Sequence, residues 1–177
     1  MGKPTDPEIA ILFAGLLYGN DGSRSLAESE LIKTYGNISL HSSISDWSYS
    51  DYYKDELGDT IRRKFLLFER IISPDEIADI KTATNAMERR FSEGSKRTVN
   101  IDPGYLTLSK LVLASSKDFC HRIFLKKGIY AEVTLYYQGN GFRQMPFTYL
   151  DYKQDETLRF FEAARAHLKE RIYSLNL

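Results

Sequence analysis

Three apolar runs within residues 1–72 follow the patterns of β-strands. Residues 9–18 are almost wholly apolar, and a run of this length is typical of a central strand buried on both faces. Residues 38–44 alternate apolar and polar positions, which predicts a strand with one buried face. Residues 64–72 are again mostly apolar and predict a second interior strand.

Helix signals follow the first strand and recur over residues 156–173. Ser25 and Glu28 form a capping box, and the apolar residues after them share one helical side. Gly36 then favours the end of this helix, because glycine readily adopts the left-handed conformation found there. Residues 156–173 carry an apolar stripe at helical spacing and predict a further helix.

The helix predicted after residue 72 has the clearest boundaries. Ser73 is a suitable N-cap, Pro74 suits the first helical position, and Glu76 completes a capping box. Apolar residues recur at helical spacing over residues 77–91, and Gly94 is placed to end the run.

The middle of the chain alternates turn and strand signals. Residues 97–102 predict a strand, and Pro103-Gly104 predicts a tight turn directly after it. The Leu-rich residues 105–115 fit a strand or a helix, and the alternation of their first leucines favours a strand.

A β-hairpin is expected further along, and one earlier segment gives no regular pattern. Residues 122–125 and 129–137 flank Lys126-Lys127-Gly128, which is a turn signature between two strands. Residues 45–59 are acidic and aromatic, and we expect an irregular excursion there.

This order of elements predicts an α+β fold in a single domain that spans residues 1–177. The first six elements match the ferredoxin-like split βαβ pattern (βαββαβ), to which the hairpin and a C-terminal helix are added. We expect a mostly antiparallel sheet with helices on one face. A doubly wound parallel sheet is the alternative, but it needs more helices than the sequence predicts. Fold alone implies no function.

Cysteine content and hydropathy bear on the compartment. Cys120 is the one cysteine among 177 residues and cannot form a disulfide within the chain, which favours a reducing environment. Residues 1–8 lack a signal-peptide pattern, and no apolar run reaches the roughly 20 residues of a membrane-spanning helix. We therefore expect a cytoplasmic protein without a membrane partner.

Charge is balanced over the chain but not along it. The chain has 24 Lys+Arg and 24 Asp+Glu, yet residues 1–60 hold four basic against ten acidic residues, a net charge of −6. Residues 89–127 hold nine basic against three acidic residues, a net charge of +6. The basic segment suggests a face that attracts anions, and the alternative is a chance segregation of solvated charges. The sequence pI of about 6.8 argues against a nucleic-acid-binding domain.

Ready-made nucleotide and metal motifs are absent from the sequence. The Gly-rich stretch after residue 15 has Asn20 where a P-loop needs glycine, and no lysine follows its glycines. Neither the dinucleotide fingerprint G-x-G-x-x-G nor the aromatic motif of RNA-recognition domains occurs. One cysteine and three histidines do not supply a zinc site, so we predict no metal site; the cofactor, if any, is not indicated.

The densest group of chemically capable residues lies in the basic segment, around Asn100-Ile-Asp-Pro-Gly-Tyr105. The predicted turn would hold the Asp102 carboxylate at a strand end on rigid backbone, and the alternative is an Asp that only caps its own turn. The candidates for proton transfer are Asp102, His121 and Glu132. The candidates for binding a phosphate or carboxylate are Asn100, Tyr105, Lys110, Lys117 and Arg122.

Two further predicted elements each have a polar face that can be interpreted in two ways. One lies on the strand predicted over residues 129–137, and the other on the helix predicted over residues 77–91. Such a face either contacts solvent or lines a polar pocket, and solvent contact is the expectation for amphipathic elements. The residues concerned are Tyr130, Glu132, Thr134 and Tyr136 on the strand and Lys81, Asn85 and Arg89 on the helix.

Residues 100–105 closely resemble the Asn-Leu-Asp-Pro-Gly-Tyr signature of a bacterial and archaeal family that is a domain of unknown function. Only Ile101 departs from the signature, and the change is between apolar residues. The resemblance extends over the whole chain through Thr107–Ala114, His121–Ile123, Gly128–Leu135, Asp51-Tyr52-Tyr53 and Thr148-Tyr149. Some members carry the label GTP-binding protein, which implies a nucleotide ligand. This chain has neither a P-loop nor an Asn-Lys-x-Asp motif, so a nucleotide would have to bind through Lys and Arg side chains in another manner.

Three functions remain open at this point. The leading hypothesis is a domain that binds a small anionic ligand, bearing phosphate or carboxylate, at the polar site around Asp102, with acid–base chemistry as an extension. A structural homo-oligomer, in which the acidic residues 1–60 meet the basic segment of a neighbour, is the second. A nucleotide- or nucleic-acid-binding module is the third, and the overall charge makes nucleic acid the least favoured partner.

Overall fold

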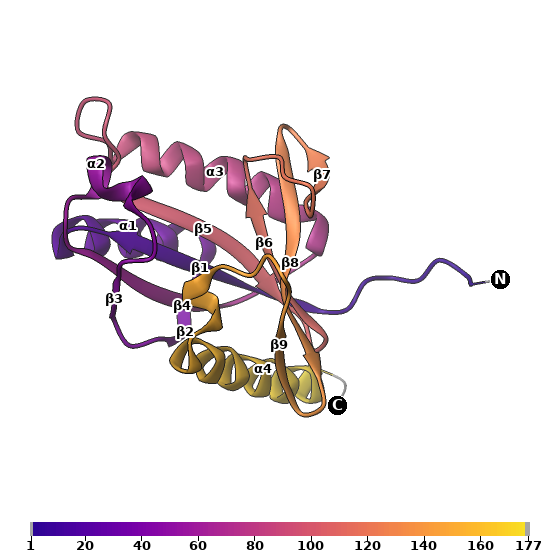
Figure 1. The fold of residues 1–177 in the computed structure, drawn as a ribbon. Coiled ribbons are helices and arrows are strands. Elements are labelled where there is room, and N and C mark those ends of the chain that lie inside the picture. Colours follow the sequence, from indigo (N-terminus) through magenta and orange to yellow (C-terminus); the bar gives the residue numbers. More distant parts are fainter. Residues whose placement is uncertain (1, 176–177) are drawn as a thin grey trace.

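The structure is a computed structural model, and it describes residues 2–175. One sheet of nine strands forms the centre, in the order β2-β4-β1-β5-β6-β8-β7, with β3 paired to β4 and β9 paired to β8 (Figure 1). The strands are β1 (Ala10–Tyr18), β2 (Ile38–His41), β3 (Ser45–Trp47), β4 (Ile61–Ile72), β5 (Val99–Leu106), β6 (Lys110–Ser115), β7 (Ile123–Lys126), β8 (Ile129–Gln138) and β9 (Gly141–Gln144).

Four α-helices and three short 3-10 helices complete the described residues. The α-helices are α1 (Asp21–Tyr35), α2 (Lys54–Leu57), α3 (Ile77–Arg90) and α4 (Asp155–Leu175). The 3-10 helices are η1 (Asp51–Tyr53), η2 (Pro74–Glu76) and η3 (Leu150–Lys153). None of the helices in this part of the chain is long and apolar enough to cross a membrane.

Strand β1 lies inside the sheet, between β4 and β5, and all nine of its residues are buried. Its even-numbered side chains pack with α1 and α3, whereas Ile11 and Phe13 pack with α4 through Phe161. The prediction that helices cover only one face is therefore wrong, because α4 covers the opposite face from α1 and α3 (Figure 1). An entirely apolar strand needs such a layer on each side.

The α+β class and the mostly antiparallel sheet are confirmed, since every strand pair in the described sheet is antiparallel. Four strands have the order β2-β4-β1-β5, with α1 joining β1 to β2 and α3 following β4 before β5. The sheet continues well beyond these four strands, so the narrower ferredoxin-like description remains a prediction.

Helix starts were predicted with mixed success. Ser73 and Glu76 form the expected capping box, which precedes α3 through the turn η2. Helix α1, however, begins at Asp21, and the side chain of Asn20 caps it by accepting the Ser23 N–H at 2.9 Å. The predicted capping box at residue 25 is wrong because Asn20, only two residues after the end of β1, already caps the helix.

Strand β5 departs most from the prediction, because it runs straight through Pro103-Gly104. The expected turn is absent. A Cβ on Gly104 would lie 2.4 Å from the carbonyl oxygen of Val112 and 2.5 Å from the Phe13 ring, so only glycine fits where β6 and β1 approach this strand. Proline tolerates this position because it immediately precedes the start of pairing with β6.

Strands β5 and β6 pair over only three residues, from Gly104 to Leu106. The first part of β5, residues 99–103, pairs with β1 but has no partner on its β6 side within the described residues. The two strands diverge from that point, and α3 passes across the gap (Figure 1). A sheet opened in this way places polar side chains of β5 next to an interior space rather than next to another strand.

The β7–β8 hairpin is confirmed, with Lys127 and Gly128 at positive φ of 55° and 72° in its turn. The Leu-rich residues 105–115 hold the end of β5 and the strand β6. Residues 45–59 contain more regular structure than expected, namely β3, η1 and α2. This segment is fixed by a small cluster of Trp47, Leu57, Leu17 and Ile61.

Candidate functional site

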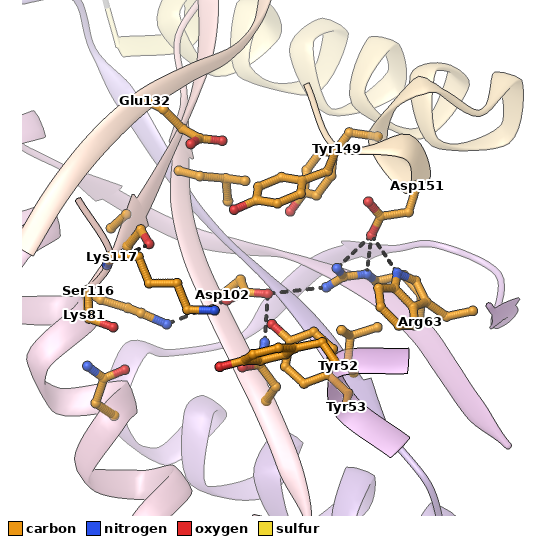
Figure 2. Close-up of a pocket in the computed structure, with 18 of the residues that line it drawn as sticks. Tyr52, Tyr53, Arg63, Lys81, Asp102, Ser116, Lys117, Glu132, Tyr149 and Asp151 are labelled. Atoms are coloured by element: carbon orange, nitrogen blue, oxygen red, sulfur yellow. Dashed lines mark hydrogen bonds and ion pairs between the residues drawn. The ribbon is translucent and has the colours of Figure 1, made fainter. Parts of the chain in front are cut away.

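A cavity of about 310 Å³ lies where β5 and β6 diverge. Its walls come from β5 and β6, from α3, from residues 45–53 and from the segment that contains η3 (Figure 2). The lining residues are Leu17, Trp47, Tyr52, Tyr53, Arg63, Lys81, Asn85, Arg97, Asn100, Asp102, Leu113, Ala114, Ser115, Ser116, Lys117, Glu132, Tyr149, Asp151 and Tyr152.

Asp102 lies at the centre of this cavity (Figure 2). One carboxylate oxygen lies 3.5 Å from Nζ of Lys81; the other accepts a 2.7 Å hydrogen bond from the Asn100 amide and lies 3.6 Å from Nη1 of Arg63. Burial raises the pKa of Asp102, but Lys81, Arg63 and Asn100 outweigh burial and hold the pKa below its usual value. Asp102 is therefore an ionised hydrogen-bond acceptor, and 27% of its side chain remains exposed to the cavity.

Arg63, from β4, forms the buried floor beside Asp102. Its Nε and Nη2 donate to Oδ2 of Asp151 at 2.9 and 2.6 Å, and Nε1 of Trp47 donates to the same oxygen at 3.2 Å. Burial lowers the pKa of Arg63, while Asp151 and Asp102 raise it to above its usual value. Gly15 leaves room for the guanidinium, since a Cβ there would lie 2.8 Å from Nη1.

A second ionic network closes the α2 side of the cavity. Arg97 donates to Glu56 in α2 at 2.6 and 2.9 Å, to Glu88 in α3 at 3.0 Å and to the side-chain oxygen of Asn100 at 2.9 Å. Glu88 also accepts the backbone N–H of Ile101 at 2.7 Å. These bonds attach the aromatic segment before α2 to β5, and they orient the Asn100 amide toward Asp102.

A third group lies on the β8 side. Oε2 of buried Glu132 accepts from Nε of Arg122 at 2.6 Å and contacts Nε2 of His121 at 2.9 Å. Arg122 also donates to the hydroxyl of Tyr149, and the His121 ring stacks on Phe147 at 4.4 Å. Burial, with a contribution from Glu132, raises the pKa of Tyr149 to about 12, so this phenol keeps its proton at neutral pH.

Lys117 differs from the other cations of the cavity in its partner. Its Nζ lies 3.9 Å from the centroid of the Tyr52 ring, a cation–π contact. No carboxylate lies within ion-pair distance of this ammonium in the part of the chain that the structure describes. Lys117 therefore brings an uncompensated positive charge to the cavity.

The structure places some of the predicted site residues at the cavity and others away from it. Asn100, Asp102, Lys117 and Glu132 line the cavity. His121 and Arg122 lie behind Glu132 and contact it. The remaining two are elsewhere: Tyr105 points to the other face of β5, where it packs with the α1–α3 core, and Lys110 lies outside the cavity lining. Successive residues of a strand alternate between faces, which explains why Tyr105 and Asp102 separate.

Several lining residues were not predicted. Lys81 and Asn85 share one helical face that was expected to contact solvent, but α3 turns this face toward the gap between β5 and β6, and Lys81 is buried. Glu132 and Thr134 are likewise buried rather than solvated, whereas Arg89 is exposed as expected. The i, i+4 spacing of Lys81 and Asn85 was the available signal, and only the tertiary arrangement decides its meaning.

The remaining lining residues had weaker sequence signals. Arg63 lies near the start of β4, within Arg62-Arg63-Lys64 and just before the strand predicted over residues 64–72, so no sequence pattern distinguished it from its charged neighbours. Trp47, Tyr52 and Tyr53 of the 45–59 segment line the cavity although the segment was expected to be irregular. Groups of three or more His, Cys, Asp or Glu side chains that could hold a metal ion are absent from residues 2–175.

Comparison with known proteins gives one family. The family described as Domain of unknown function (DUF4416) matches residues 8–168, which is nearly the whole chain. The chain belongs to the DUF4416 family. No curated protein and no solved structure matches it. The resemblance drawn from the Asn-Ile-Asp-Pro-Gly-Tyr segment is thereby confirmed at the level of the family. In this DUF4416 chain the segment forms the part of β5 that borders the cavity.

The lowered pKa of Asp102 predicts a specific pH dependence of stability. A carboxyl whose folded pKa lies below its unfolded value of about 3.9 stabilises the protein above that pH and loses this contribution as pH falls through the folded pKa. The difference in unfolding free energy between wild type and Asp102→Asn should therefore shrink steadily below about pH 4. Urea unfolding between pH 7 and pH 3 measures it.

Asp118→Asn is the matched control, because Asp118 is exposed and no ion pair is found for it among the described residues. A pH dependence that Asp102→Asn shows and Asp118→Asn does not would be due to the contacts of Asp102. A difference for Asp102→Asn that stays constant down to pH 3 would contradict the ionic environment described for this carboxylate.

Proposed function

We propose that this protein binds a small anionic ligand, bearing a carboxylate or phosphate, in the cavity around Asp102. The observation that carries the proposal is the uncompensated ammonium of Lys117 at a cavity of about 310 Å³. Enclosed cavities with a few convergent polar groups are the usual form of small-molecule sites. A ligand anion would supply the partner that Lys117 lacks.

The charges that line the cavity support an anion over a cation. Four cationic side chains and three carboxylates line it, which gives a net charge of +1. Each carboxylate is already engaged: Asp151 by Arg63, Asp102 by Lys81 and Glu132 by Arg122. Desolvated charges are stable only with such partners, so these three carboxylates have little capacity to bind an added cation.

We extend this proposal to proton transfer between the cavity residues and the ligand. Asp102 is ionised and exposed to the cavity, so it can accept a proton from a ligand, but Lys81 and Arg63 lower its pKa and make it a weak base. Tyr149 retains its proton and is suited to donate a hydrogen bond to a developing negative charge. Glu132 and His121 contact each other and would act as positioning residues for this side of the site.

A second candidate function, self-association, is favoured by the exposed edge strand β7. Ile123, Phe124 and Leu125 are 73%, 58% and 38% exposed, and β7 ends the sheet. Exposed apolar edges are typical sites of strand pairing. Antiparallel pairing of two β7 strands would set Phe124 opposite Leu125 and Ile123 opposite Lys126. The two copies of Lys126, the charged residue of β7, would therefore not lie opposite each other.

We also propose that the strands β2-β4-β1-β5 with α1 and α3 constitute a ferredoxin-like unit to which β6–β9 and α4 are added. The strand order and the antiparallel pairing of these four strands support this interpretation. It carries no function by itself.

Lys117→Met should weaken anion binding while leaving the fold unchanged, because the ammonium is exposed and holds no carboxylate. Binding of benzoate and of inorganic phosphate, measured by isothermal titration calorimetry, should fall about tenfold or more for Lys117→Met, the effect of losing one charged hydrogen bond. Lys110→Met is the control and should retain wild-type affinity, since Lys110 lies outside the cavity lining. Equal losses in both variants, or binding of neither anion by wild type, would contradict the proposal.

Self-association predicts a dimer in light scattering at micromolar to submillimolar protein concentration. Phe124→Glu should shift the mass to that of a monomer, because a carboxylate would be buried in the paired strands. Ile44→Glu, at an exposed apolar residue outside β7, should leave the mass unchanged. A wild-type monomer at every concentration tested would rule out this second function.

A further inference from the structure

Aromatic rings border the cavity on two sides of Asp102. Figure 2 shows Tyr149 on one side and Tyr52 with Tyr53 on the other. Tyr52 and Tyr149 are 60% and 45% exposed, so a ligand can reach them. Flat rings pack favourably on such faces, in offset stacked or edge-to-face geometry. A bare inorganic anion would make no such contact with the rings.

The anion-binding group is next to an aromatic face. Nζ of Lys117 lies 3.9 Å from the centroid of the Tyr52 ring. The ammonium covers one face of the Tyr52 ring, so a ligand ring that packs against the edge of Tyr52 has a cation within reach of its own substituents. A carboxylate attached directly to that ring is the simplest anion that satisfies both contacts.

Whereas Lys117 calls for an anion on the ligand, Asp102 calls for a hydrogen-bond donor. Its ionised carboxylate can only accept hydrogen bonds, and it already accepts from Asn100 and pairs with Lys81. The exposed 27% of the side chain leaves an acceptor site that faces the cavity. A hydroxyl or amino group on the ligand would donate to this site.

The volume of the cavity sets an upper limit on the size of the ligand. Small-molecule sites commonly enclose roughly 300–1,000 Å³, and about 310 Å³ is at the lower end. That space suits one aromatic ring with small substituents. It is too small to enclose a dinucleotide.

From these observations we infer that the ligand class is a small aromatic carboxylate that carries a hydroxyl or amino group on its ring. The ring packs against Tyr52 and Tyr149, the carboxylate pairs with Lys117, and the ring substituent donates to Asp102. This inference rests on the proposed function, because it specifies which anion the cavity selects.

Calorimetric titration of the wild-type protein with three carboxylates tests the inferred ligand class. The probes are 4-hydroxybenzoate, 4-methoxybenzoate, which lacks the donor, and cyclohexanecarboxylate, which lacks the aromatic ring. 4-Hydroxybenzoate should bind about tenfold more tightly than cyclohexanecarboxylate, as two aromatic contacts predict. It should bind about fivefold to tenfold more tightly than 4-methoxybenzoate, as one hydrogen bond to a charged acceptor predicts.

Two variants assign these preferences to the residues. Tyr52→Leu should remove most of the preference for the aromatic ring, whereas Tyr173→Leu, at an exposed tyrosine of α4 outside the cavity lining, should keep it. Asp102→Asn should reduce the preference for hydroxyl over methoxy, because it weakens the acceptor. Thermal unfolding of each variant confirms that it is folded before the affinities are compared.

The outcomes separate this inference from the proposed function. Equal affinity for 4-hydroxybenzoate and cyclohexanecarboxylate would overturn the aromatic class while leaving anion binding intact. Binding of inorganic phosphate without binding of any carboxylate would do the same. Failure of all three carboxylates and of phosphate to bind would overturn both.

Discussion

The buried guanidinium of Arg63 holds together the parts of the chain that build the cavity. It joins β4, to which it belongs, with Asp151 of η3 and Asp102 of β5, and the shared Asp151 oxygen also binds Trp47 of β3. An unpaired ion in this position would cost several kcal/mol, so the partners of Arg63 are needed for the fold itself. The same pairing leaves Asp102 ionised at the cavity, which links the stability of the fold to the chemistry of the site.

The second constraint is the short pairing between β5 and β6. Gly104 allows β6 and Phe13 to approach β5 closely, and beyond this point the strands separate. The gap is filled from α3, where buried Lys81 donates to the carbonyl oxygen of Ile101 at 2.8 Å and faces Asp102. Charged residues therefore occupy a place that an ordinary sheet would give to backbone hydrogen bonds. A polar interior space follows directly from this break in the ladder.

Local patterns predicted most of the elements but not how they combine. The apolar run of β1, the capping box before α3 and the β7–β8 turn were correct because each depends on neighbouring residues only. Pro103-Gly104 misled the prediction, since close contacts with distant residues override turn chemistry there.

Only part of the site was predicted, because contacts between distant elements decide which residues meet there. Asp102 and Lys117 line the cavity as their segment suggested, whereas Tyr105 does not because strand alternation turns it away. Arg63 and Lys81 come from β4 and α3, and the sequence holds no local sign that these elements meet β5 at one point. Residues 89–127 carry an excess of basic residues, but Arg97 among them serves mainly to bind Glu56 and Glu88. Lys117 is the one cavity-lining cation of this segment that has no carboxylate partner among the described residues.

The claim that the space between β5 and β6 is a ligand site can be tested by mapping where an anion binds. Amide chemical shifts of the isotopically labelled protein, followed during titration with 4-hydroxybenzoate, report the position directly. The largest shifts should occur at Asn85, Asp102, Ser116 and Lys117, which surround the cavity. Shifts concentrated on β7 or α4, or no shifts at millimolar ligand, would contradict the claim.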